Sequence, residues 1–124
     1  MIYIAVVGTR YIFDYNYFKS ILDKHLFECD KINITLVSGG CSGADIYAEQ
    51  YAKNNNIKII VFYAQWKKYG RKAGPMRNNL IEKKCDICIA FPIKSSRGTK
   101  HTTRLFEKHN KELYVYYVDN YLTN

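Results

Sequence analysis

The sequence contains no long hydrophobic run, and none of its apolar stretches approaches the ~18–20 residues that a membrane-spanning helix needs. Its first ten residues, MIYIAVVGTR, have neither the charged leading region nor the small-residue cleavage site of a signal peptide. No linker, repeat or low-complexity segment interrupts the 124 residues. These absences argue against a secreted or membrane protein, and they favour one cytoplasmic domain over residues 1–124.

Cysteine is scarce, and the four that occur predict no disulfide framework in a chain with cytosolic features. Cys85 and Cys88 have the C-x-x-C spacing of metal and redox sites. The other two, Cys29 and Cys41, do not supply the second closely spaced pair of a structural zinc site. The C-x-x-C segment also leads into apolar residues 87–91, whereas a thioredoxin-type pair opens a helix. We therefore predict that Cys85 and Cys88 lie in the core, and that the chain holds no metal and no other cofactor.

Acidic residues are also few, because 11 Asp and Glu stand against 19 Lys and Arg, which gives a formal charge of +8. The imbalance is local: residues 64–104 carry a net charge of +9, and the rest of the chain carries −1. Lys83 and Lys84 fit an ordinary solvated helix surface. The remaining cations favour an anionic partner, such as a nucleotide or a nucleic acid.

Apolar runs alternate regularly with segments of helical spacing. The runs 2–7, 34–37, 57–62, 87–91 and 113–118 predict five strands. Helices are predicted after Asp14, which can cap the first of them, over 43–55, from Gly74-Pro75, and over 100–110. This alternation predicts an α/β fold with a mainly parallel five-stranded sheet between two layers of helices. Ligands of such sheets bind beyond the carboxyl ends of the strands.

Two of the loops at that edge are rich in glycine. Gly8-Thr9-Arg10 follows the first strand, and Ser38-Gly39-Gly40-Cys41-Ser42-Gly43-Ala44-Asp45 follows the second. The second loop can form a concavity of backbone N–H groups that cradles a phosphate or a ribose. Asp45 has two interpretations, as a ligand contact or as a helix cap. Glu49, one turn later, is either part of the site or an i,i+4 partner of Lys53.

The other two loops supply cations. Residues 66–78 hold five cations and no acid, and Trp66 and Tyr69 stand among them as stacking surfaces for a base. Arg77 and Asn78 belong to the first turn of the next helix, where the helix dipole also favours an anion. The fourth loop, Ser96-Arg97-Gly98-Thr99, is a second phosphate-binding turn. His101 is either a general acid or base, or an ordinary solvated donor.

These segments together resemble the SLOG superfamily, and in particular its YspA-like branch. The resemblance rests on segments that run in order along the chain: Val7-Gly8-Thr9-Arg10, Phe13-Asp14-Tyr15, Val37-Ser38-Gly39-Gly40, Gly43-Ala44-Asp45, Trp66 with Tyr69-Gly70, Ala73 to Asn78, and Ser96 to Thr99 with His101-Thr102. It implies a Rossmann-like three-layer α/β/α domain that binds nucleotides or nucleotide-derived ligands at these loops.

Two related families imply more specific activities. Lonely Guy phosphoribohydrolases split a nucleoside monophosphate into base and ribose phosphate, and Arg77 matches their catalytic arginine. Their motif glutamate, which stabilises the positive charge that develops on the ribose, falls on Thr102. Asp45 or Glu49 would then have to supply the carboxylate. DNA-processing protein A, which binds single-stranded DNA, has segments similar to Gly8-Thr9-Arg10, 38–45 and 77–79.

The sequence thus leads to one main hypothesis and two alternatives. The chain binds a phosphorylated nucleotide or an ADP-ribose-like molecule, as a sensor or a sequestering protein. The alternatives are hydrolysis of a nucleotide N-glycosidic bond, with Arg77, Asp45 and Glu49 as catalytic candidates, and binding of single-stranded nucleic acid. A homodimer or higher homo-oligomer is expected from the resemblance. The predicted ligand contacts are Gly8, Thr9, Arg10, Ser38, Gly39, Gly40, Gly43, Asp45, Trp66, Tyr69, Arg77, Asn78, Ser96, Arg97, Gly98, Thr99 and Thr102.

Overall fold

The computed structural model describes residues 1–123, and its centre is a five-stranded sheet in the order β3-β2-β1-β4-β5. All four neighbouring pairs of strands are parallel, as predicted. The strands are β1 (Ile2–Gly8), β2 (Ile34–Ser38), β3 (Lys58–Val61), β4 (Ile87–Phe91) and β5 (Glu112–Val115). The chain adds β2 and β3 on one side of β1 and then crosses to β4 on the other side.

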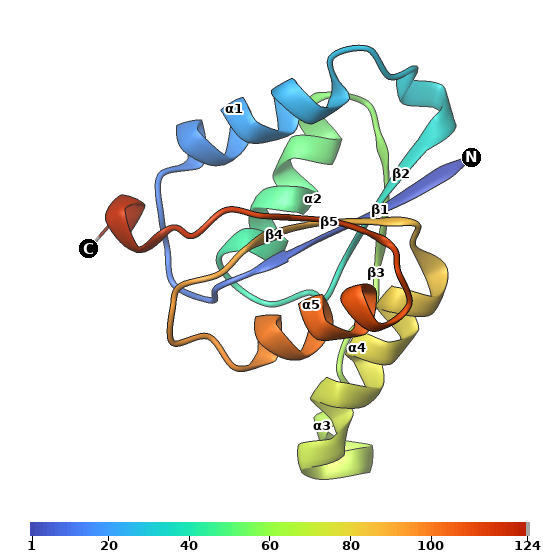
Figure 1. Ribbon diagram of the computed structural model, residues 1–124, viewed down its shortest axis with the longest axis vertical. Coiled ribbons are helices and arrows are strands. Elements are labelled where there is room, and N and C mark those ends of the chain that lie inside the picture. Colours follow the sequence, from blue (N-terminus) through green and yellow to red (C-terminus); the bar gives the residue numbers. More distant parts are fainter. Residues whose placement is uncertain (124) are drawn as a thin grey trace.

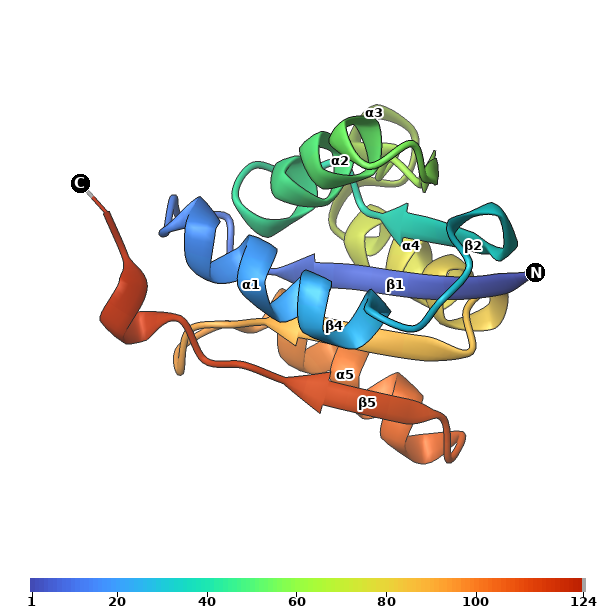
Figure 2. The ribbon, with the colours of Figure 1, turned by 90° about the horizontal axis from the view of Figure 1, so that it is seen from above.

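Helices cover both faces of this sheet. They are α1 (Tyr15–Leu26), α2 (Ala44–Asn54), α3 (Trp66–Tyr69), α4 (Ala73–Lys84) and α5 (Gly98–Lys108). Helices α1 and α2 lie on one face, and α4 and α5 lie on the other (Figure 1). Seen from above, strands β2, β1, β4 and β5 run side by side with α1 in front of them (Figure 2). The architecture is the Rossmann-like three-layer α/β/α fold that the sequence predicted.

The continuous apolar runs are explained by burial on both faces of the strands. In β1, Ile4 and Val6 pack with residues of α1 and α2, whereas Ala5 and Val7 pack with residues of α4 and α5. Successive side chains of a strand point to opposite faces, so a strand covered on both sides needs an apolar residue at every position. This is why runs of apolar residues were enough to predict the strand positions.

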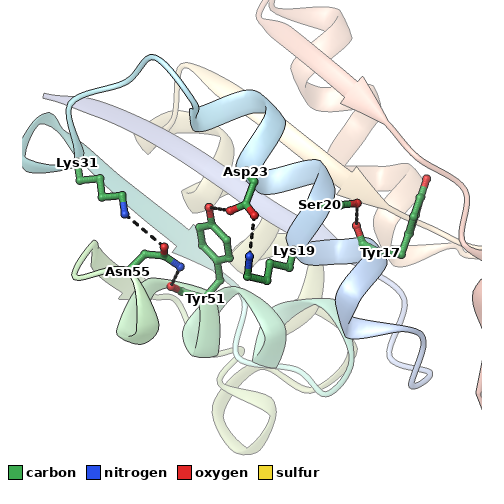
Figure 3. A network of polar contacts seen from close by, with 7 residues as sticks. All are labelled: Tyr17, Lys19, Ser20, Asp23, Lys31, Tyr51 and Asn55. Atoms are coloured by element: carbon green, nitrogen blue, oxygen red, sulfur yellow. Dashed lines mark hydrogen bonds and ion pairs between the residues drawn. The ribbon is translucent and has the colours of Figure 1, made fainter.

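A network of hydrogen bonds links α1 to α2, the two helices that cover the same face of the sheet (Figure 3). The Tyr51 hydroxyl, which is buried, donates to Asp23 at 2.7 Å, and Lys19 donates to the other carboxylate oxygen at 2.8 Å. These hydrogen bonds from Lys19 and Tyr51 lower the pKa of Asp23. Asn55, at the end of α2, accepts from Lys31 and donates to the Tyr51 carbonyl.

Several element boundaries differ from the sequence predictions. Asp14 caps α1 as predicted, because its carboxylate accepts from the Asn16 amide at 2.8 Å. The last strand stops at Val115 instead of residue 118. Short helical turns were missed: η1 (Lys31–Asn33), η2 (Gly70–Lys72), η3 (Asp119–Tyr121) and helix α3.

Cys85 and Cys88 are buried, as predicted for core residues. Burial raises the pKa of the Cys85 thiol to about 12 and also raises the pKa of Cys88, so both thiols stay protonated at neutral pH. Among residues 1–123, no group of three or more His, Cys, Asp or Glu side chains could hold a metal ion. The same residues form no helix of the length and apolarity that crossing a membrane requires.

Candidate ligand-binding site

A cavity of about 400 Å³ opens at the carboxyl ends of β1 and β4, the two strands between which the chain changes direction across the sheet. This is the position at which ligands of open α/β sheets bind, and the volume falls in the ~300–1,000 Å³ range of small-molecule sites. Its walls come from the β1–α1 loop, the β2–α2 loop, the second and third turns of α4 and the β4–α5 loop. The fold therefore brings together four segments that are distant in sequence. Arg77 and Asn78 lie in the second turn of α4 and not in the predicted first turn, because the helix already begins at Ala73.

Most of the predicted contact residues line this cavity. They are Gly8, Thr9, Arg10, Gly39, Asp45, Arg77, Asn78, Ser96, Arg97, Gly98, Thr99 and Thr102. Those that do not line it are Ser38, Gly40, Gly43, Trp66 and Tyr69, together with the catalytic candidate Glu49. The structure thus assembles one part of the predicted set and assigns the other part to different surroundings.

The β1–α1 loop packs over the amino terminus of α2 and takes the first backbone donor of this helix. The Ala44 amide donates to the Thr9 carbonyl at 3.1 Å, and the Ser42 hydroxyl donates to the Arg10 carbonyl at 2.9 Å. Gly43 has φ +71°, and a Cβ atom there would lie 2.2 Å from the Thr9 oxygen. Glycine at this position therefore permits a close approach of two loops, which a side chain would block.

Asp45 holds the β2–α2 loop and does not cap the helix. The N-cap is Gly43, which has no side chain to accept a hydrogen bond. Oδ2 of Asp45 accepts from the Cys41 amide at 3.1 Å, and Oδ1 is buried with no hydrogen-bond partner among the described residues. Burial raises the pKa of Asp45 to about 6, although the Cys41 amide and the Arg77 charge oppose this shift. One oxygen of this carboxylate, at the wall of the cavity, is therefore enclosed and unpartnered.

Arg77 and Asn78 connect the walls of the cavity to one another. The guanidinium of Arg77, a residue only 8% exposed, donates from Nη1 to the Gly39 carbonyl and from Nε to the Asn78 side chain at 2.8 Å. Its Nη2 group has no partner among residues 1–123. A Cβ at Gly39 would lie 2.5 Å from Nη1, so glycine is what lets the guanidinium reach the loop backbone. Arg77 is thus fixed in place with two N–H donors left over.

Helix α5 begins at the cavity with unsatisfied backbone donors. No side chain caps it, and among residues 1–123 no acceptor is found for the amides of residues 97–100. The Asn78 side chain approaches the Gly98 carbonyl at 3.4 Å and Nδ1 of His101 at 3.2 Å. His101 therefore lies within α5, partly exposed, with Nδ1 next to the Asn78 side chain. The free amides make this helix end a ready site for an anion.

Three residues predicted for the site, from the third loop and from α2, do not line the cavity. Trp66 and Tyr69 form the short helix α3, which the sequence analysis missed, and this turn carries both rings outside the cavity. The Trp66 ring packs against Gly74 instead. Glu49 does not line the cavity, and among the described residues no ion pair joins it to Lys53.

Sequence reasoning also missed part of the lining, namely Val7, Tyr11, Cys41, Ile81, Ile93 and Ser95. Tyr11 carried a usable signal, because it is an aromatic residue directly after Arg10 in a strand-to-helix loop. The apolar members gave none, because a residue that lines a cavity and a residue that fills a core have the same local pattern.

Comparison with known proteins places this site in a family. A family model described as the YspA, cpYpsA-related SLOG family matches residues 2–69, which is more than half of the chain. The chain belongs to this family. The matched part of the SLOG domain runs from β1 to α3 and includes the first two cavity loops, whereas α4 and the β4–α5 loop lie beyond it.

In sequence, this SLOG chain is similar to the gene 61 protein of Mycobacterium phage D29, with 35% identity over 81 residues. That match covers 60% of the chain and 65% of the phage protein. The chain thus spans slightly less than two thirds of this relative.

Two solved structures share the fold of the SLOG chain at low sequence identity. DNA processing protein A from Streptococcus pneumoniae superimposes with a TM-score of 0.76 at 17% identity, over 93% of this chain and 50% of that one. DNA processing protein A from Helicobacter pylori, which has been described for its single-stranded DNA binding mode, gives a TM-score of 0.70 at 21% identity. That alignment covers 92% of this chain and 64% of the other.

Proposed function

We propose that this SLOG chain binds a small phosphorylated nucleotide or nucleotide derivative in the cavity between β1 and β4. The observation that carries the proposal is the open amino terminus of α5, whose free amides 97–100 adjoin a cavity lined by arginine side chains. Backbone amides and the helix dipole bind anions there without any change in the protein. The role that follows is that of a sensor or a sequestering protein for such a ligand.

The other lining groups suit the rest of a nucleotide. Arg10 and Arg97 are exposed at the cavity and can move onto a phosphate, while the free Nη2 donors of Arg77 are held in place. Asp45 also lines the cavity, and its carboxylate can accept a hydrogen bond from a ribose hydroxyl. Tyr11 is the aromatic ring at the cavity, so it takes the base-stacking role that the sequence analysis had given to Trp66 and Tyr69.

Binding without turnover is favoured over hydrolysis by the surroundings of Thr102. Its hydroxyl approaches the Gly98 carbonyl at 3.4 Å within α5, and no carboxylate stands at that position. Asp45 is the one acidic residue that lines the cavity. Hydrolysis would therefore depend on Asp45. The hydrolysis hypothesis predicts that free base and sugar phosphate form when the protein is incubated with nucleoside monophosphates.

Replacing Arg97 by alanine is expected to weaken nucleotide affinity about tenfold, because a charge-assisted hydrogen bond to phosphate contributes at least ~1.4 kcal/mol. Isothermal titration calorimetry with a panel of mono- and dinucleotides measures the effect. Arg104→Ala is the matched control, since Arg104 is an exposed arginine on the same helix that does not line the cavity. It should leave the affinity unchanged.

Three outcomes would contradict the proposal. If no nucleotide of the panel binds, the cavity serves a different ligand. If Arg97→Ala and Arg104→Ala weaken binding equally, the effect comes from net charge and not from the amino terminus of α5. If mass spectrometry of the incubated mixture finds free base that disappears in Asp45→Asn, the site is hydrolytic.

A further inference from the structure

Residues 65–72 form a projection that the cavity does not use. Helix α3 and the turn η2 lie at one end of the molecule, beyond the amino terminus of α4 and away from the sheet (Figure 1). All eight residues are exposed, and none of them lines the cavity. We refer to this segment as the α3–η2 projection.

The α3–η2 projection carries four cations without any acid. They are Lys67, Lys68, Arg71 and Lys72. Within residues 1–123, none of the four takes part in an ion pair. Four unneutralised charges in six residues create a positive potential that attracts a polyanion.

Two aromatic rings stand among these charges and remain accessible. Trp66 is 50% exposed and Tyr69 is 39% exposed. The Trp66 ring is nevertheless supported, because a Cβ at the buried residue Gly74 would come within 3.1 Å of it. Lys68 Nζ lies 5.1 Å from the centre of the Tyr69 ring. Half-exposed rings beside cations that form no ion pair provide surfaces on which unpaired bases can stack while the cations contact phosphates.

We propose that the α3–η2 projection is a binding surface for single-stranded nucleic acid, separate from the nucleotide cavity. A duplex offers phosphates but keeps its bases stacked on each other, so it can use the cations and not the rings. The proposal therefore requires a preference for single strands over duplex of the same length. It does not depend on what the cavity binds.

The first test uses fluorescein-labelled oligo-dT of about 15 nucleotides, which lies within the ~4–16-nucleotide range of single-strand binding sites. Fluorescence anisotropy at several salt concentrations should give a slope of log K against log[salt] near −3, since four phosphate contacts contribute about −0.7 each. Trp66 is the sole tryptophan of the chain, so quenching of its fluorescence by unlabelled oligo-dT reports contact at the projection itself.

The decisive comparison is between two double variants with the same loss of charge. Lys67→Ala/Lys68→Ala should reduce the magnitude of the slope by about 1.4 and weaken binding more than ~10-fold near 0.1 M salt. The control is Lys83→Ala/Lys84→Ala, which removes two exposed lysines at the far end of α4. Trp66→Leu should also weaken binding, whereas Trp66→Phe, which keeps a ring, should retain most of it.

Several results would overturn the proposal. Equal losses in the two lysine variants would show a non-specific charge effect, and equal affinity for the duplex would show that no base stacks. If the projection variant instead loses binding to phosphatidylserine vesicles while oligo-dT never binds, the surface faces a membrane. Arg97→Ala should leave oligo-dT binding intact, so its loss in that variant would place the strand in the cavity. Failure of nucleotide binding alone contradicts only the proposed function.

Discussion

Replacing Lys111 by methionine is expected to lower the free energy of unfolding by about 3 kcal/mol. Lys111 Nζ lies 2.6 Å from Oε2 of Glu82, a carboxylate on α4 that is only 4% exposed. The same ammonium donates to the Glu82 and Cys85 carbonyls, which lie at the carboxyl end of α4. Removing one partner of a buried ion pair leaves an uncompensated charge in the interior, and such changes cost ~3–5 kcal/mol. The lower end applies because Lys111 and His109 are partly exposed.

The electrostatics of Glu82 support this estimate. Burial would raise the pKa of this carboxylate, but the hydrogen bonds and charges of Lys111 and His109 outweigh it and hold the pKa below its usual value. His109 Nδ1 lies 2.6 Å from Oε1. The cluster joins the end of α4 to the segment between α5 and β5, and its loss would loosen the two helices that carry Arg77 and Gly98 to the cavity.

Urea denaturation of the wild type, Lys111→Met and two controls measures the effect. Lys19→Met breaks the exposed pair with Asp23, in which both side chains are about half exposed, and should cost less than ~1 kcal/mol. Glu82→Leu/Lys111→Met removes both charges and should recover most of the loss. If Lys111→Met costs no more than Lys19→Met, the Glu82 cluster does not stabilise the fold.

Acidification from pH 7 to pH 4 is expected to stabilise the protein by about 2 kcal/mol through protonation of Asp45. Burial raises the pKa of this carboxyl from 3.8 to about 6, and each unit corresponds to ~1.36 kcal/mol. Between these two pH values the folded state binds more protons than the unfolded state, so stability falls as the pH rises. The full penalty is present only well above about pH 6 and is absent only well below about pH 4, so this pH range covers most of it.

Other carboxyl groups act in the opposite direction, so the prediction is tested as a difference. The pKa of Asp23 is lowered by its hydrogen bonds to Lys19 and Tyr51, and that stabilisation is lost as the pH falls. Chemical denaturation of the wild type and Asp45→Asn between pH 4 and pH 7 isolates the contribution of Asp45. The variant should become more stable relative to the wild type as the pH rises. Asp23→Asn should instead become less stable relative to the wild type as the pH rises. The prediction would be contradicted if the free energies of unfolding of the wild type and Asp45→Asn changed in parallel with pH.

The positions of the strands along the chain could be predicted from the sequence, because a buried strand is recognised by its own run of apolar residues. Residues of β1 such as Ile4 and Ala5 are apolar at consecutive positions because both faces are covered, and this pattern is visible without any partner. The end of β5 was predicted too late in the chain, because the residues after it still have a strand-like pattern. The amides of Tyr116 and Val118 still donate to Ala90 and Pro92, so the residues look like strand although the ladder ends at Val115.

The position of the candidate site could also be predicted from the sequence. Glycines, hydroxyls and arginines follow successive strands, and parallel strands bring their carboxyl ends to one edge. Arg10, Arg77, Arg97 and Gly98 therefore line one cavity, although up to 88 residues separate them. The alternation of strands and helices and the residue types of the loops can be read from short segments. The parallel topology then brings these loops together at one edge of the sheet.

Only the tertiary structure decided which of these groups are free to bind. Helices α2 and α5 both begin at this edge. The Thr9 carbonyl takes the first amide of α2, whereas no acceptor among residues 1–123 takes the amides of residues 97–100 at α5. Trp66 and Tyr69 are directed away from the cavity by a turn of one helix. A hydrogen-bond donor looks the same in sequence whether or not a distant carbonyl has taken it, so its availability is a property of the packed chain.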